Sequence, residues 1–184
     1  MTRLPFPDPP LADQLILLRP WSMADVGPAW TATQDPLIWR HTHVPERQSE
    51  DDVRRFVADR EPRRLAGHEL GFVIADATDE AFLGCVSLLR LDWAERRGEV
   101  GYYLAEWARG RGVMTRAVRL LASWTLLNLG LARLALIADL DNLPSQAVAE
   151  RCGFTREGVL RSFEERKGHR IDVVMFSLLP DDLN

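Results

Sequence analysis

Arg109-Gly110-Arg111-Gly112-Val113-Met114 lies where a predicted β-strand gives way to the longest helical pattern in the chain. Two glycines in a strand-to-helix turn let a ligand approach the backbone closely, because no Cβ stands in the way. The first amides of a helix have no partner within it and carry partial positive charge, so they suit phosphate oxygens. Arg109 and Arg111 can add charge-assisted contacts. The stretch predicts a phosphate-binding turn, with a tight corner that binds nothing as the alternative.

The residues around these glycines do not fit two common nucleotide-binding loops. No Gly-Lys-Ser/Thr follows, so the stretch is not a Walker A loop. The pattern Gly110-x-Gly112 also lacks the third glycine of the dinucleotide fingerprint, and Thr115 stands in its place. In addition, the stretch comes late in the chain, whereas the dinucleotide turn follows the first strand of a doubly wound sheet.

The elements on either side of the turn form a predicted strand–helix–strand unit. Residues 99–104 have the β-prone pattern, 113–129 repeat apolar side chains at helical spacing, and 133–140 form another strand. Gly130 stands where a glycine commonly ends a helix. Two strands joined by a crossover helix are expected to pair in parallel, with a right-handed connection.

The remaining pattern completes a mixed α/β domain. Ser49, followed by an acidic residue three positions on, predicts the start of a helix, and Asp35-Pro36 predicts a turn. Residues 1–13 are rich in proline and are expected to form a flexible tail, so that 14–184 make a single domain. The other predicted strands cover 15–18, 70–75, 82–91, 154–163 and 172–179, and the other helices cover 23–34, 49–64 and 142–151.

Composition excludes several classes of function. The 184 residues are 46% hydrophobic and 27% charged, as in ordinary globular proteins. A formal charge of -4 gives no basic surface for nucleic acid. No window approaches the ~18 apolar residues of a membrane span, and the N-terminus lacks a signal-peptide core. Cys85 and Cys152 sit in apolar surroundings as free thiols, so we expect a cytoplasmic protein without membrane or nucleic-acid partners.

A second segment carries a family resemblance. The stretch 142–154 (NLPSQAVAERCGF), followed by Glu157-Gly158, resembles the signature of the Gcn5-related N-acetyltransferase (GNAT) superfamily, in particular its RimJ/RimL-like branch. Residues 109–114 fit the superfamily's Q/R-x-x-G-x-G/A pattern, with Met114 in the last place. Residues 98–104 are similar to its central strand. The match extends over nearly the whole chain and includes Asp172.

The resemblance implies a central mixed, mostly antiparallel sheet of about seven strands flanked by about four helices. The two central strands would splay into a V near Tyr103, and the pantetheine of acetyl-CoA would pair with the strand in the gap. The pyrophosphate would rest on the amides of residues 111–114, Asn142 would contact the cofactor arm, and Arg151 would approach the adenosine phosphate or be a solvated helix charge. The implied cofactor-binding residues are Tyr103, Leu104, Arg109, Gly110, Arg111, Gly112, Val113, Met114, Asn142, Ser145 and Arg151.

Acyl transfer to an amine requires a base for the amine and a proton for the leaving thiolate. Glu99 is the candidate base by family position, and a carboxylate in an apolar strand tends to have a raised pKa; the alternative is a surface charge paired with Arg97. The tyrosine that often protonates the thiolate in the superfamily would fall at Ala149. Ser145, the branch's usual replacement, is therefore the candidate donor, or else it satisfies a helix amide.

The acceptor is the least determined part. His41-x-His43 with Glu46 is weak evidence for a metal, and we expect none. Trp39, His41 and His43 are expected instead to form part of the acceptor wall. The resemblance allows a protein N-terminal α-amine or a small-molecule amine as acceptor. It also allows succinyl- or another acyl-CoA as donor, a weakly active acyl-CoA-binding regulator, and a homodimer.

Overall fold

One mixed sheet of eight strands organises the chain. The computed structural model describes residues 4–183, and its strands follow the order β1-β2-β3-β4-β5-β6-β8-β7 across the sheet. The strands are β1 (Leu11–Ala12), β2 (Ile16–Arg19), β3 (Leu70–Asp76), β4 (Phe82–Asp92), β5 (Arg97–Leu104), β6 (Arg133–Asp139), β7 (Thr155–Arg166) and β8 (His169–Leu178). The α-helices are α1 (Val26–Thr33), α2 (Pro36–His41), α3 (Glu50–Leu65), α4 (Val113–Asn128) and α5 (Leu143–Arg151), with single 3-10 turns at Met23–Asp25, Glu106–Ala108 and Pro180–Asp182.

The predicted fold class is confirmed, with two small elements that the sequence patterns did not indicate. One is β1, whose two residues pair with β2. The other is α2, which begins where we expected only a turn. The Asp35 carboxylate accepts a hydrogen bond from the amide of Leu37 at 2.9 Å, and Pro36 occupies the first helical position. Proline is tolerated there because that amide has no partner within the helix, so Asp-Pro starts this helix.

The segment that we expected to be a flexible tail is packed from Leu4 onward, which corrects the prediction. Leu4 is fully buried, and its amide donates to the carbonyl of Arg64 at 3.3 Å. The ring of Phe6 lies edge-on to Phe72 at 5.7 Å, and the Arg64 guanidinium stacks on its other side at 4.6 Å. Burial of these two apolar side chains offsets the entropy lost on ordering the segment. Residues 1–3 of the predicted tail lie outside the described residues.

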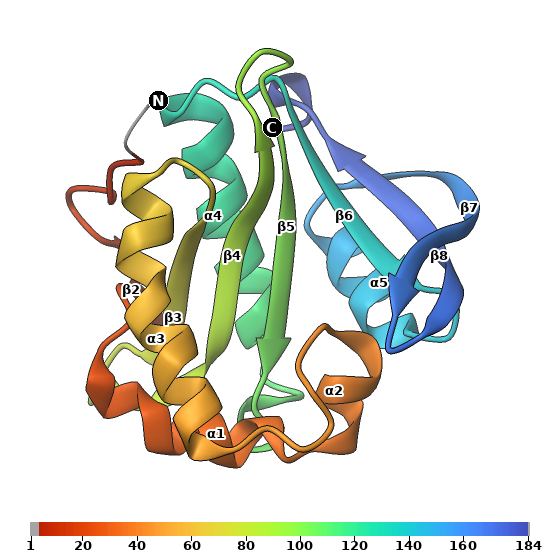
Figure 1. Ribbon diagram of the computed structural model, residues 1–184. Coiled ribbons are helices and arrows are strands. Elements are labelled where there is room, and N and C mark those ends of the chain that lie inside the picture. The colour runs from red at the N-terminus through yellow and green to blue at the C-terminus, as the bar shows by residue number, and fades with distance from the viewer. Residues whose placement is uncertain (1–3, 184) are drawn as a thin grey trace.

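Helices cover both faces of the sheet: α1 and α3 cover one, and α4 and α5 the other (Figure 1). Successive side chains of strand β3 lie on opposite faces of the sheet and so contribute to the core beneath each helical layer. Phe72 and Ile74 belong to the core cluster under α4, while Val73 and Ala75 pack with α1 and α3. Both cysteines are free and buried. No helix within residues 4–183 combines the length and the apolar character that a membrane span requires.

The parallel pairing of the strands around α4 is confirmed, and it is short. Arg97 to Glu99 of β5 pair with Arg133 to Ala135 of β6, and beyond these residues the two strands diverge (Figure 1). The predicted splay between the central strands is therefore present and opens directly after Glu99. It divides the sheet into a large arm, β1 to β5, and a small arm made of β6, β8 and β7.

Candidate active site

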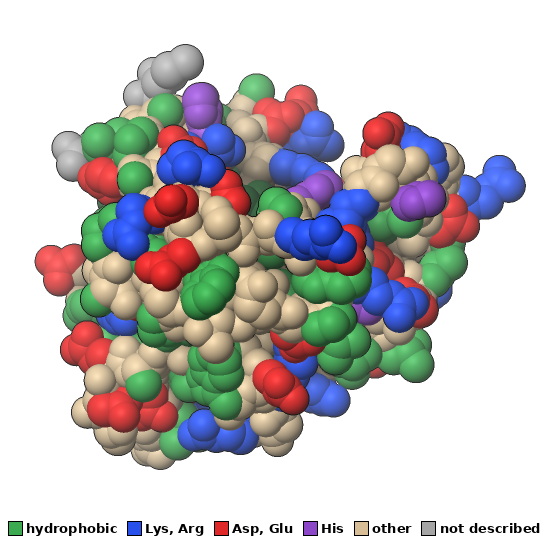
Figure 2. All heavy atoms as spheres, turned by 60° about the horizontal axis from the view of Figure 1, so that its bottom comes forward, with side chains coloured by type: hydrophobic (Ala, Val, Ile, Leu, Met, Phe, Trp, Pro, Cys, Tyr) green, Lys and Arg blue, Asp and Glu red, His purple; other side chains and the backbone are tan. Residues whose placement is uncertain are grey.

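A cavity of about 1560 Å³ lies between the two arms of the sheet. Every site residue expected from the sequence lines it except Arg111. His41 and His43 of the expected acceptor wall also line it, whereas Trp39 does not. Charged side chains of both signs cover this face of the molecule, on the small arm as well as on the large arm (Figure 2). The structure therefore brings the motifs of the sequence together around one space.

The glycine turn forms a backbone site at the start of α4. Gly110 and Gly112 both have φ 73°, in the left-handed region, and a Cβ on either would meet no atom within 4 Å. Glycine is needed at both positions because of the backbone conformation, and the space beside them is open. The amide of Arg116 donates to the Gly112 carbonyl at 3.2 Å, which starts the helical ladder. The amides of Val113 to Thr115 precede that bond, so a ligand at the helix start can accept from them.

The arginines of this turn hold the loop in place. The Arg109 guanidinium donates to the Leu104 carbonyl at 3.0 Å and forms an ion pair with Asp35. Arg111 is more than half exposed and lies 3.8 Å from the Asp76 carboxylate. Both side chains thus have protein partners, and their contacts with phosphate remain predictions.

Two other arginines line the cavity farther along the same helical layer. Arg119 of α4 donates to the backbone carbonyl of Arg151 at the end of α5, and both side chains reach the cavity. Sequence reasoning missed Arg119, although helical spacing places it two turns after Gly112 on the same face. Arg116, in contrast, forms an ion pair with Asp13 at 2.7 Å and ties the N-terminal segment to α4.

The hydroxyl of Ser145 lies next to a tyrosine hydroxyl in the wall of the cavity. Asn142 caps α5 by accepting from the Ser145 amide at 3.2 Å, so the Ser145 hydroxyl is not needed for that purpose. The hydroxyl instead lies 2.9 Å from the Tyr102 hydroxyl. Burial raises the pKa of Tyr102 and also that of Tyr103, so both phenols are neutral near pH 7. The cap at the start of α5 is thus supplied by Asn142, and the Ser145 hydroxyl contacts Tyr102 in the wall of the cavity.

Glu99 stands at the point where the two arms separate. Its side chain is 13% exposed and accepts a hydrogen bond from Arg90 at 2.9 Å. Arg97, the partner considered from the sequence, instead pairs with Asp92 at 3.1 Å. Burial raises the pKa of Glu99, and the Arg90 charge partly opposes that effect. A carboxylate with a raised pKa beside a large cavity is suited to accept a proton.

A second carboxylate, Glu164 of β7, approaches Glu99 from the small arm. Its oxygens accept from Arg90 at 2.6 Å and from Arg166 at 2.7 Å, and His43 Nε2 lies 3.0 Å away. Burial opposes ionisation, but these hydrogen bonds lower the pKa of Glu164 to about 2. Sequence reasoning missed Glu164 and Arg166. Their signal was two charges at a spacing of two on a strand, which places both on one face.

The charged network continues from Arg166 to the segment around α2. Arg166 donates to both oxygens of Asp139 at 2.7 and 2.9 Å, and His41 Nδ1 lies 2.8 Å from the same carboxylate. His41, Asp139 and Asp141 could offer ligand atoms within 4.8 Å of one another, but Arg166 and Arg40 already neutralise the two carboxylates. His41 and His43 contact different carboxylates, so the motif His41-x-His43 is not a ligand pair here.

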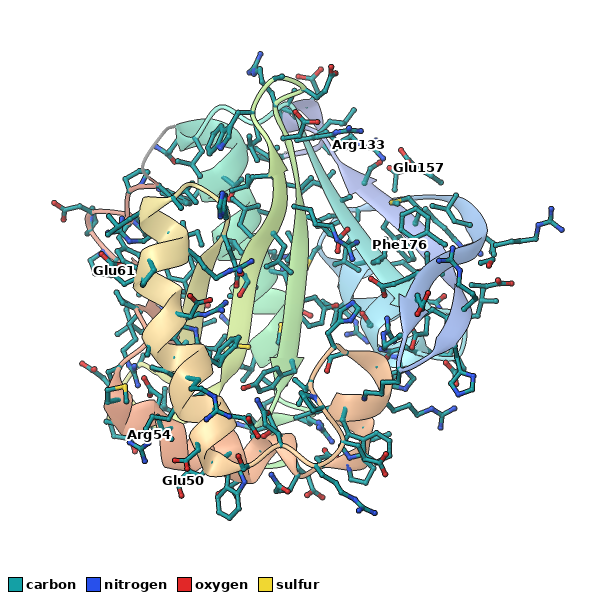
Figure 3. All side chains as sticks on the ribbon, viewed as in Figure 1. Glu50, Arg54, Glu61, Arg133, Glu157 and Phe176 are labelled. Carbon is teal, nitrogen blue, oxygen red and sulfur yellow. The ribbon has the colours of Figure 1, made fainter. Side chains whose placement is uncertain are left out.

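Other ion pairs lie away from this network. Glu50 and Arg54 pair along the exposed side of α3, and Arg133 pairs with Glu157 on the small arm (Figure 3). These pairs are at least one-third exposed, whereas the side chains of Glu164 and Arg166 are each 8% exposed. The charges of Glu164 and Arg166 beside the cavity are therefore much less accessible to solvent than those of these two pairs.

Comparison with known proteins gives a consistent family. The model of the Acetyltransferase (GNAT) domain matches residues 16–155. YdaF of Bacillus subtilis (strain 168), named as a candidate ribosomal N-acetyltransferase, is 36% identical over 77% of this chain and 69% of its own. The ribosomal-protein-serine acetyltransferase of Escherichia coli (strain K12) is 28% identical over 73% of this chain and 74% of its own.

A solved structure agrees in fold. The L7/L12 α-N-protein acetyltransferase RimL, in complex with coenzyme A, superposes with a TM-score of 0.83 over 94% of this chain and 98% of that one, at 22% identity. The expected resemblance is thus confirmed by sequence and by fold. The chain belongs to the Gcn5-related N-acetyltransferase family, RimJ/RimL-like branch, and is an acyl-CoA-dependent acyltransferase.

Proposed function

We propose that the protein transfers the acetyl group of acetyl-CoA to a primary amine by direct attack within a ternary complex. The single observation that carries the proposal is the position of Glu99. This half-buried carboxylate lies where the sheet splits, in the same cavity as the open amides at the start of α4. A phosphate-binding helix start and a proton acceptor in one cavity are the two parts that the transfer requires.

Glu99 and Ser145 have separate proposed roles in the transfer. Glu99 takes a proton from the acceptor ammonium, directly or through water, and the freed lone pair attacks the thioester carbon. The new C–N bond replaces the C–S bond. The Ser145 hydroxyl gives its proton to the leaving sulfur, which departs as the thiol, and regains one from the nitrogen, which loses a proton on becoming an amide. Glu99 lies on β5 and Ser145 lies in the first turn of α5, and both line the cavity, so we place the reacting carbon between them. Holding both substrates in this space supplies much of the rate.

Glu99 is a better base than its neighbour Glu164 for an electrostatic reason. Glu164 has hydrogen bonds from Arg90 and Arg166 that lower its pKa to about 2, and such a carboxylate takes a proton poorly at neutral pH. Glu99 has one arginine contact and a pKa raised by burial. The cavity therefore holds one carboxylate suited to proton transfer and one suited to holding charges in place.

The donor and acceptor classes rest on the relatives. RimL is described as binding coenzyme A, and two relatives are named for acetylation of ribosomal proteins. For this chain we propose acetyl-CoA as donor, bound along Tyr103 and Leu104 with its pyrophosphate on the amides at 111–114. Asn142 contacts the cofactor arm, and Arg151 its phosphate end. The acceptor is an α-amine of a protein or a small-molecule amine, and succinyl-CoA is the alternative donor.

The test is thiol release with purified protein. Acetyl-CoA and succinyl-CoA are each offered with peptides of different N-terminal residues, polyamines and aminoglycosides. We expect Glu99→Gln to lower kcat by about 100-fold, because a positioned base contributes on the order of 100- to 10,000-fold, and to leave coenzyme A affinity unchanged. Glu95→Gln, an exposed carboxylate nearby, serves as control.

Other outcomes have distinct meanings. Full activity of Glu99→Gln together with an inactive Glu164→Gln would assign the base to Glu164. Coenzyme A binding without thiol release over the whole panel would favour an acyl-CoA-binding regulator. Failure to bind any acyl-CoA would contradict the proposal altogether.

A further inference from the structure

Arg90 connects the two arms of the sheet at the point where they separate. Backbone pairing between the arms ends at Glu99 and Ala135. Just beyond it, one end of the Arg90 guanidinium donates to Glu99 at 2.9 Å and the other donates to Glu164 at 2.6 Å. Glu164 lies 74 residues along the chain from Arg90 and belongs to the opposite arm. A side-chain bridge thus continues the connection where the backbone bonds stop.

Irregular backbone brings both ends of this bridge into place. Arg90 has φ 49° and lies where the register between β4 and β5 shifts, between Leu89 and Asp92. On the small arm, Ser162 has φ 50° and lies in the register shift between Leu160 and Glu164. Non-glycine residues avoid this region, and where they adopt it the strain is commonly linked to function. Bulges of this kind turn a side chain toward a site that a regular strand would not reach.

The bulge before Glu164 is fixed by contacts of its own. The amide of Ser162 donates to the Asp172 carboxylate at 2.7 Å, and Arg170 Nε donates to the Ser162 hydroxyl at 3.1 Å. These bonds hold the irregular conformation from the neighbouring strand β8. The large arm therefore has irregular backbone at Arg90 itself. The small arm has it at Ser162, two residues before Glu164, where the contacts from β8 hold it.

We propose that Arg90 is a positioning residue for the transfer: it fixes the Glu99 carboxylate where the two arms separate by anchoring it to Glu164 on the opposite arm. The proposal rests on the proposed role of Glu99 as base. It assigns Arg90 and Glu164 no contact with the reacting atoms.

Sharing Arg90 between two carboxylates also sets how basic Glu99 is. The charged groups facing Glu99 are Arg90 from β4, Glu164 from β7 and His43 from the segment after α2. Glu164 draws part of the Arg90 charge away from Glu99, and its own negative charge disfavours ionisation of Glu99. Without Arg90, Glu99 should protonate at higher pH. Without the charge of Glu164, Arg90 should pair with Glu99 alone, which should then protonate at lower pH.

The experiment measures the titration of Glu99 directly and does not depend on the acceptor. Full-length protein carrying ¹³C-labelled glutamate carboxyls is titrated by NMR, and the Glu99 signal is assigned from its loss in Glu99→Gln. We expect its midpoint to rise by about one pH unit in Arg90→Met, since an opposite charge at this distance shifts a carboxyl pKa by about 1–3 units. We expect it to fall in Glu164→Gln. Arg97→Met, which removes a nearby guanidinium that pairs with Asp92, should leave it in place.

Kinetics with acetyl-CoA supply the second readout, using a serine-initiated hexapeptide and spermidine as amines. We expect Arg90→Met to lower kcat about tenfold with little change in the KM for acetyl-CoA, which is the pattern of a lost orienting contact. Arg90→Lys should restore part of kcat, because a lysine keeps the charge but cannot bridge both carboxylates with a planar fork. If Arg90→Met does not fold, Arg90→Lys still tests the titration.

The outcomes separate the two proposals. Equal Glu99 midpoints in the wild type and Arg90→Met, or shifts in the same direction for Arg90→Met and Glu164→Gln, would overturn the role of Arg90. Opposite shifts combined with full activity of Glu99→Gln would uphold the bridge and reject Glu99 as the base.

Discussion

The two ends of the cavity, which we propose to hold the donor and the acceptor and therefore call the donor end and the acceptor end, are built in different ways. At the donor end, a single stretch, Arg109 to Met114, provides two left-handed glycines and the open start of α4. At the acceptor end, charged side chains from β4, β5, β6, β7 and the region of α2 form one connected network. The donor end is a property of local backbone, and the acceptor end is a property of long-range packing. Substitutions elsewhere in the fold should therefore leave the glycine turn intact. The charged network, in contrast, depends on every strand and helix that contributes a side chain to it.

This difference predicts where single substitutions act. Changes in the network should reduce stability first, because they leave buried charges without partners. Changes in the glycine turn should reduce coenzyme A binding and leave the rest of the fold intact. Changes at the hydroxyl between the two ends should affect the rate alone.

The largest effect is expected for Arg166→Met. Arg166 has an 8% exposed side chain and neutralises both Glu164 and Asp139. Removing one partner of a buried ion pair costs up to about 3–5 kcal/mol. Glu164 keeps Arg90 and His43, and Asp139 keeps His41, but both carboxylates lose the most buried cation of the network. We expect the free energy of unfolding in urea to fall by that amount. Arg54→Met, which removes an exposed i,i+4 pair with Glu50 on α3, should cost less than about 1 kcal/mol. Equal losses in the two variants would show that the buried network contributes no more to stability than an exposed ion pair does.

A smaller effect on a different quantity is expected for Gly112→Val. A β-branched residue at φ 73° carries a strain of about 1–3 kcal/mol. If the loop relaxes to relieve that strain, the amides at the start of α4 move, so the Kd for coenzyme A, measured by calorimetry, should rise at least roughly tenfold. Gly168→Val is the matched control, since Gly168 has φ 78° and equally open surroundings in the turn between β7 and β8. It should lose similar stability and keep its coenzyme A affinity; a loss of affinity there would show that the turn at Gly112 is not special.

The smallest effect is expected for Ser145→Ala. Its hydroxyl is the proposed proton donor, but a thiolate is already a good leaving group, so we expect kcat to fall roughly three- to tenfold, less than for Glu99→Gln. KM for acetyl-CoA should change little, since Asn142 still caps α5. Ser123→Ala on α4 is the control and should be without effect. A hundredfold loss of kcat in Ser145→Ala would show that protonation of the leaving sulfur, and not deprotonation of the amine, limits the rate.

Prediction from the sequence worked best for structural features that depend on residues close together in the chain. The cap at Ser49, the length of α4 and the parallel pairing of β5 with β6 were predicted from spacing and are present. Two local predictions need correction. The turn at Asp35-Pro36 is present after α1, but the same residues also start α2, since residues that break one helix can cap the next. The N-terminal segment is packed, since proline content concealed two apolar residues that find places in the core.

The partner of Glu99 shows the limit of such prediction. From the sequence the nearest arginine, Arg97, was the natural candidate. A regular β5 strand puts residues 97 and 99 on one face, but the bulge in β4 brings Arg90 to the carboxylate and leaves Arg97 with Asp92. Two register shifts and two positive φ angles decide this pairing. The residue types alone do not predict these register shifts and φ angles, because the same residue can lie in regular or in bulged strand backbone, depending on the surrounding contacts.

By itself the sequence determined the family, and it supplied the predicted donor site and Glu99 and Ser145 as candidates. These depend on glycine conformation, helix starts and the order of elements, which are set within a few residues. Only the tertiary structure decided that Arg90, Glu164, Arg166, Asp139 and the two histidines His41 and His43 meet beside the cavity. The free energy of such a network comes from charges brought together across the fold and withdrawn from water, and the chain must fold before any of them can act on another.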